Sequence, residues 1–92
     1  MKRTLFETLE LYIPVVIRVH GQENPEIKEV GVLFEQLKEQ ISQEAEVSQT
    51  FEQIRKVTNN YTVPGGVCES YAAVYHMLAE GEEELYATNL IK

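Results

Sequence analysis

The sequence predicts an all-α protein, and three observations support this prediction. Between Gly31 and Pro64 the chain contains neither glycine nor proline, the two residues least compatible with a helix interior. Most residues of that stretch are strong helix formers. Apolar residues recur in it at spacings of three and four, which marks the buried face of a helix. We expect three helices with a long central one, which form four-helix-bundle layers through an exchanged homodimer.

The first helix is expected to begin near Leu5, because Thr4 followed by Glu7 matches a capping box. Proline removes one backbone hydrogen bond, so Pro14 is expected to kink or divide this helix. Gly21 is expected to end it. The predicted apolar stripe consists of Phe6, Leu9, Ile13 and Val16, with His20 at the next position on the same line.

A single central helix is predicted over Pro25–Thr58, about 34 residues and roughly 50 Å in length. Asn24 suits the cap of this helix and Pro25 its first position. Its apolar stripe is Ile27, Val30, Phe34, Leu37, Ile41, Val47, Phe51, Ile54 and Val57. The residues of Ser42–Glu46 are mostly polar but carry no turn signal. The alternative is a break there, which would fold the chain into a monomeric four-helix bundle.

The last helix is predicted to begin at residue 68 or 69 and to run to near residue 92. Residues 59–60 are expected to end the preceding helix, and residues 62–66 form a turn-rich loop. Gly81 either permits a close helix approach or weakens the helix by about 1 kcal/mol. The predicted buried line is Tyr71, Val74, Tyr75, Leu78 and Leu85.

The homodimer follows from the unequal lengths of these helices. The first and last helices each cover only half of the long one, so one side of its apolar stripe would face water. A two-fold partner that runs antiparallel would cover that side, with each half of one long helix packed against the opposite half of the other.

Composition limits the function and the environment. Ninety-two residues make one domain, residues 1–92. A net charge of −7 disfavours nucleic acid and anionic membrane as partners. No run of apolar residues is long enough to span a bilayer. The single cysteine, Cys68, excludes an internal disulfide and suits a reducing compartment, so we expect a cytoplasmic protein.

Two segments carry a resemblance to a known family. Val19-His20-Gly21 followed by Asn24-Pro25-Glu26-Ile27 is similar to a Val-His-Gly…His-Pro-Glu-Leu turn, and the segment from Ile54 to Tyr71 is similar to Ile-Arg-x-Leu-Thr-Asn-x-Tyr-Thr-x-Pro-x-x-Ala-Cys-x-Ser-Tyr. Both patterns occur in the hemerythrin-like domain of the iron-sulfur cluster repair (repair of iron centres) di-iron proteins. The resemblance covers most of the chain outside Glu39–Thr50 and implies a shortened domain of that type, linked to nitrosative or oxidative stress.

The family resemblance implies a four-helix bundle that holds two irons, but this chain keeps few of the ligands. His20 falls on a ligand histidine of the family, and Glu44 falls near another. The last ligand pair falls on Thr88 and Lys92, and a lysine cannot replace a carboxylate. A segment with two further ligands is missing, together with the loop between the second and third bundle helices. We therefore expect no di-iron site of the family type, and the deletion explains why two helices would fuse into one.

Several residues remain candidates for chemistry. His20 is predicted to be a buried histidine held by a backbone carbonyl near Gly21; the alternative is a residual iron or zinc site formed by His20 and Glu44. Glu82 is expected to reach solvent at the edge of a helix layer. Cys68 is either a small structural residue or a low-pKa thiol at a helix N-terminus.

The sequence carries no Ser-His-Asp set, no glycine-rich phosphate loop and no Cys/His zinc spacing. We therefore expect a non-catalytic protein without a cofactor that acts through protein–protein interaction. The resemblance implies an iron-sulfur protein or a full-length family member as its partner. The alternative function is a residual iron- or zinc-binding protein linked to iron-sulfur cluster repair.

Overall fold

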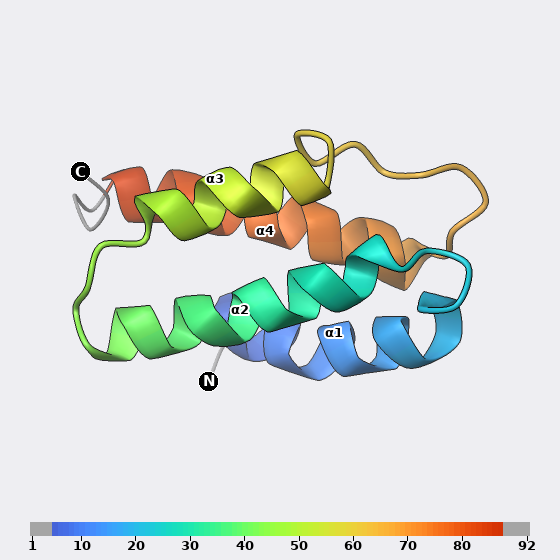
Figure 1. Cartoon of the computed structure of the whole chain (residues 1–92), viewed down its shortest axis with the longest axis horizontal. Coiled ribbons are helices and arrows are strands. Elements are labelled where there is room, and N and C mark those ends of the chain that lie inside the picture. Colours follow the sequence, from blue (N-terminus) through green and yellow to red (C-terminus); the bar gives the residue numbers. More distant parts are fainter. Residues whose placement is uncertain (1–4, 88–92) are drawn as a thin grey trace.

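The computed structural model describes residues 5–87, and within this range the chain forms four helices and no strand. The helices are α1 (Leu5–His20), α2 (Glu26–Ser42), α3 (Ser48–Val57) and α4 (Glu69–Ala87). They alternate in direction along the chain, and the closest pairs are α1–α4, α2–α3 and α1–α2 (Figure 1). The predicted all-α class is confirmed. None of the helices in the described range is both long and apolar enough to cross a membrane.

The continuous helix predicted over Pro25–Thr58 is wrong, because the chain reverses direction between α2 and α3 (Figure 1). The Glu44 amide donates to the Ile41 carbonyl at 3.1 Å, and the Ala45 amide donates to the Gln40 carbonyl at 2.8 Å. Glu44 has a φ of 55°. This pair of bonds around one left-handed residue is the Schellman arrangement that ends helices. The described residues thus form four helices where three were expected, and the reversal lies at the alternative break near Ser42–Glu46.

Burial explains why the chain turns back. The residues of Ser42–Glu46 are all exposed, so a helix across them would bury no apolar surface. The turn instead lets Val47, Phe51 and Ile54 join the core of their own chain. Each such side chain contributes about 1.5–3 kcal/mol. The left-handed conformation of a residue other than glycine costs only about 1–2 kcal/mol.

The core consists of the apolar faces predicted from the helical spacing. Its buried members come from all four helices and include every predicted position of the last helix. The predicted positions that are buried are Leu9, Ile13, Val16, Ile27, Val30, Phe34, Leu37, Val47, Phe51, Ile54, Tyr71, Val74, Tyr75, Leu78 and Leu85. The predicted faces are therefore right even where the predicted helix length is wrong.

Helix α1 begins at Leu5 and ends at His20, before Gly21, as predicted. Its proposed capping residue, Thr4, lies outside the described residues. The helix is not divided at Pro14, whose ring is exposed to solvent. Buried residues of α1 lie on both sides of the proline, so both halves of the helix pack against the core.

Two glycines let α1 lie close to its neighbours α2 and α4. A Cβ atom at Gly31 of α2 would stand 2.7 Å from Ile17 Cδ1. A Cβ atom at Gly81 of α4 would stand 3.3 Å from Phe6 Cζ. Of the two interpretations of Gly81, the structure supports the close helix approach.

Candidate functional site

His20 and Cys68 meet at one end of the bundle, although 48 residues separate them in the sequence. His20 is the last residue of α1, and Cys68 directly precedes α4. His20 Nε2 lies 3.2 Å from Cys68 Sγ. The half-buried imidazole ring also packs edge-on against the ring of Tyr71, with centroids 5.4 Å apart and planes at 87°. A backbone carbonyl near Gly21 was the expected partner of His20; the partner found at Nε2 is the thiol.

The position of Cys68 changes the acidity of its thiol. Its carbonyl accepts the Ala72 amide at 3.2 Å, so Cys68 caps the N-terminus of α4. The backbone amide of Tyr71 lowers the pKa of the exposed Cys68 thiol most, and the His20 side chain lowers it further. Amides at a helix N-terminus and a neighbouring imidazole both favour the thiolate. This supports the low-pKa alternative for Cys68.

Two buried phenols lie behind this pair. The Tyr71 hydroxyl donates to the Glu26 carboxylate at 3.2 Å and lies 3.4 Å from the Tyr75 hydroxyl. Burial raises the pKa of Tyr71, and the neighbouring Tyr75 and Glu26 raise it further. Both phenols therefore stay neutral at physiological pH, and Tyr71 is a fixed surface against which the His20 ring is held.

The two residues proposed as residual metal ligands lie far apart in one chain. Glu44 is in the turn between α2 and α3, at the opposite end of the bundle from His20 (Figure 1). Among residues 5–87 there is no group of three His, Cys, Asp or Glu side chains that could hold a metal ion. Thr88 and Lys92 lie outside the described residues. An ion shared by His20 and Glu44 would need a second chain, and such a site stays a prediction.

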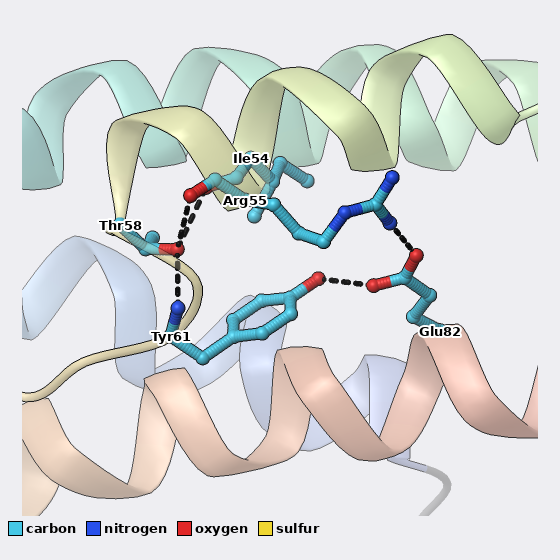
Figure 2. A network of polar contacts seen from close by, with 5 residues as sticks. All are labelled: Ile54, Arg55, Thr58, Tyr61 and Glu82. Carbon is cyan, nitrogen blue, oxygen red and sulfur yellow. Dashed lines mark hydrogen bonds and ion pairs between the residues drawn. The ribbon is translucent and has the colours of Figure 1, made fainter.

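Glu82 is buried and paired, which corrects the expectation that it reaches solvent. Its carboxylate accepts one hydrogen bond from the Arg55 guanidinium of α3 and another, at 2.7 Å, from the Tyr61 hydroxyl (Figure 2). An ion pair with additional hydrogen bonds is the form in which a carboxylate tolerates burial. The network joins α3 to α4 through side chains.

Tyr61 reaches Glu82 because the chain after α3 takes a left-handed course. Asn59, Asn60 and Tyr61 have φ values of 51°, 59° and 62°. Thr58 holds this segment: its hydroxyl donates to the Ile54 carbonyl at 2.7 Å and accepts the Tyr61 amide at 2.9 Å (Figure 2). Asparagine tolerates the left-handed region better than most residues, whereas tyrosine is rarely found there.

This network holds the helices in one arrangement. Within the described residues, every buried side-chain nitrogen or oxygen atom has a hydrogen-bond partner. A fully bonded network of this kind makes the packing of a core rigid. The strain at Tyr61 is explained by its hydrogen bonds to Thr58 and Glu82.

Helix α1 carries a second apolar face, which points away from the core. We call this face the outer stripe; it consists of Leu11, Tyr12, Val15 and Val19, which are 51, 40, 44 and 65% exposed. Val32 of α2 is also exposed, between a groove along α1 and a groove along α3. Helical spacing was used to find a single buried stripe in this helix, so the second apolar face was not predicted.

No family model matches the chain, and no curated protein or solved structure matches it either. The resemblance to the hemerythrin-like repair proteins therefore rests on the two segments quoted above, and membership of that family stays a prediction.

Proposed function

We propose that the protein is a non-catalytic helical interaction module that works as a homodimer. The outer stripe is the observation that carries this proposal. A helix that packs on a core normally exposes a polar face, yet α1 also exposes an apolar face to solvent. Contiguous exposed apolar residues mark surfaces that bind other proteins.

A second copy of the chain fits this stripe by symmetry. Leu11, Val15 and Val19 follow one another at intervals of four residues, the spacing of a ridge that packs between helices. If two α1 helices cross antiparallel about Val15, Leu11 of each copy faces Val19 of the other. A two-fold interface requires such a self-complementary surface.

Light scattering during size-exclusion chromatography tests this interface. We expect wild-type protein to approach twice its monomer mass of 10.6 kDa as its concentration rises. Val15→Glu should remain at the monomer mass, because two carboxylates at the centre of the interface would replace buried methyl groups and weaken the dimer about 100-fold or more. Gln36→Glu on the exposed side of α2 is the matched control and should behave as wild type.

The proposal for the α1 interface fails if wild-type protein stays monomeric at millimolar concentration. It fails equally if Val15→Glu, still helical by circular dichroism, dimerises as well as wild type. The second result would show that the protein dimerises through a surface other than the outer stripe.

Exchange of α3 and α4 between copies is a second route to a dimer, favoured by the turn at Glu44. The turn contains no glycine or proline, and its left-handed residue is a glutamate. If the turn straightens, α2 and α3 become the continuous helix that the sequence predicts, and α3 and α4 can fill the same places in a second copy. The core contacts are then the same, so an exchanged dimer costs little.

Substitutions at the two helix ends test the exchange. Glu44→Gly removes about 1 kcal/mol of backbone strain from the turned form of each chain, so it should disfavour an exchanged dimer about 30-fold. Asn59→Gly changes the equivalent position after α3 and should leave the mass unchanged. Dimerisation that is insensitive to Glu44→Gly would contradict exchange and leave the α1 interface in place.

The partner class follows from the family resemblance. We propose a full-length hemerythrin-like repair protein or an iron-sulfur protein as the further partner, and the cytoplasm as the place where they meet. Support for this step comes from the segments Val19–Ile27 and Ile54–Tyr71.

A further inference from the structure

We propose that the groove between α2 and α3 binds a free aliphatic carboxylate of medium chain length. The two helices lie side by side (Figure 1), and the groove along them has a volume of about 500 Å³. Small-molecule sites in proteins occupy about 300–1,000 Å³. The outer stripe lies on α1, so this site is separate from the proposed dimer interface and goes beyond it.

The floor of the groove is apolar. Val32 and Leu33 line it from α2, and Val57 lines it from α3. Val32 is 68% exposed, Leu33 is 8% exposed and Val57 is half-buried, so the groove offers apolar surface to a ligand without opening the core. An aliphatic tail that covers this surface leaves water, and the free energy gained grows with the apolar area that both lose.

A lysine lines the groove on each side. Lys28 belongs to α2 and Lys56 to α3. One acid, Glu29, also lines the groove, so bases outnumber acids there, although the whole chain carries a net charge of −7. A groove with an apolar floor and basic sides complements a molecule that has an aliphatic tail and an anionic head.

Both lysines are available to such a head group. Within residues 5–87, Lys28 takes part in no ion pair. Lys56 Nζ lies 3.6 Å from a Glu52 carboxylate oxygen, but both side chains are mostly exposed, and an exposed pair of this kind is weak. Lys38 and Arg55, by contrast, are held in ion pairs with α1 and α4.

The length of the groove limits the tail. Lys28 and Leu33 are five positions apart, which corresponds to roughly 8 Å along α2. A tail of medium length, such as that of octanoate, suits this distance, whereas a longer tail would extend into water. The net charge of −7 opposes contact with an anionic bilayer, so the occupant is a free carboxylate rather than a membrane lipid.

Titration with octanoate, followed by heteronuclear NMR spectra of the labelled protein, tests the site. Octanol and octylammonium carry the same tail with a neutral and a cationic head, and each probe is kept below the concentration at which it aggregates. We expect saturable shifts of the amides of Val32, Leu33 and Val57. The affinity should fall in the order octanoate, octanol, octylammonium. Hexanoate should bind more weakly than octanoate, by up to about fourfold for each CH₂ no longer buried.

Lys56→Glu isolates the role of the head group. It replaces an attraction by a repulsion at an exposed position, so the affinity for octanoate should fall about three- to tenfold and that for octylammonium should rise. Arg18→Glu is the matched control, because it changes the net charge equally at an exposed position that does not line the groove. At about 0.15 M salt, where distant charges are screened, it should bind both probes as wild type does.

The dimer variant Val15→Glu should bind octanoate as tightly as wild type, so the outcome for this groove is distinguishable from that for the dimer. The proposal is overturned if octanoate causes no saturable shifts, or if the shifts gather on the outer stripe. It is overturned equally if octylammonium binds wild type as tightly as octanoate does, which would indicate an apolar docking face without selection of a head group. Wild-type affinity for octanoate in Lys56→Glu, folded by circular dichroism, would also overturn it.

Discussion

At the scale of single residues, Tyr71 connects more of the molecule than any other side chain described above. Its ring is fully buried in the core and supports the His20 imidazole by its edge. Its hydroxyl reaches Glu26 at the start of α2 and Tyr75 one turn along α4. One phenol therefore fixes the relative positions of three helices at the end of the bundle that carries Cys68.

The raised pKa of Tyr71 predicts a loss of stability at high pH. The phenol ionises near pH 10 in the unfolded chain but only at higher pH in the folded one, where burial opposes the charge. The unfolded state therefore binds fewer protons above pH 10, and the free energy of unfolding falls with pH by up to about 1.4 kcal/mol per unit. Below pH 10 this contribution is fully retained.

Urea unfolding at several pH values between about 8 and 11 measures this slope. Tyr71→Phe should make the alkaline slope shallower, and Tyr12→Phe, an exposed phenol on α1, should not. Equal slopes in the wild type and in Tyr71→Phe would contradict the assignment. Tyr75, whose pKa is also raised by burial, accounts for part of the remaining slope.

Residue pairings were the least predictable feature of the candidate site. His20, Cys68 and Glu82 can be selected from the sequence, but the sequence predicted for none of them the partner found in the structure. The pairings Cys68–His20 and Glu82–Arg55 join residues 48 and 27 positions apart. Helical spacing shows which face a residue occupies, whereas such pairings depend on which helices become neighbours.

At the scale of helices, the ends depend on local backbone geometry. Gly21 follows α1, and a Cβ atom there would stand 2.5 Å from the Ile17 carbonyl oxygen. A backbone atom cannot move aside as the end of a side chain can. The chain therefore turns from α1 toward α2 at a position that only glycine fits without adjustment.

Gly21→Ala should lower the free energy of unfolding by about 1–3 kcal/mol, the usual cost of forcing extra atoms into a packed site. Gly65→Ala is the matched control, because nothing lies within 4 Å of the added atom. Its effect should stay within about 0.5 kcal/mol. Chemical denaturation of the two variants measures both values, and equal stabilities would show that the turn adapts to alanine.

Helix boundaries were predictable where residue types mark them and not elsewhere. Gly21, Asn24-Pro25 and Asn59-Asn60 are recognisable signals, and helices end or begin beside them in the structure. The end of α2 has no such residue, because its left-handed position is occupied by Glu44. The two hydrogen bonds that close this turn join backbone amides to backbone carbonyls, so they do not depend on the side chains of the turn.

At the scale of the whole molecule, the turn at Glu44 decides where α3 and α4 lie. The continuous helix predicted through Glu44 would have placed them elsewhere. The apolar faces are the same in both arrangements, and so the predicted core was found although the predicted topology was not. A continuous helix would leave part of its apolar stripe exposed in a single chain. With the reversal after α2, the apolar faces of α2 and α3 pack into one core. The number of chains needed to cover the core therefore depends on one turn that the sequence does not mark.

The pairing of α1 with α4 has a consequence for the order of folding. The first and last helices of the described chain are neighbours, and they bring His20 to Cys68. On the ribosome, α1, α2 and α3 emerge with one wall of the bundle missing, because domains are completed only when all their segments are available. The newly made thiol meets its imidazole only when α4 docks, so the chemistry of Cys68 would report that α4 has been made and has joined the bundle.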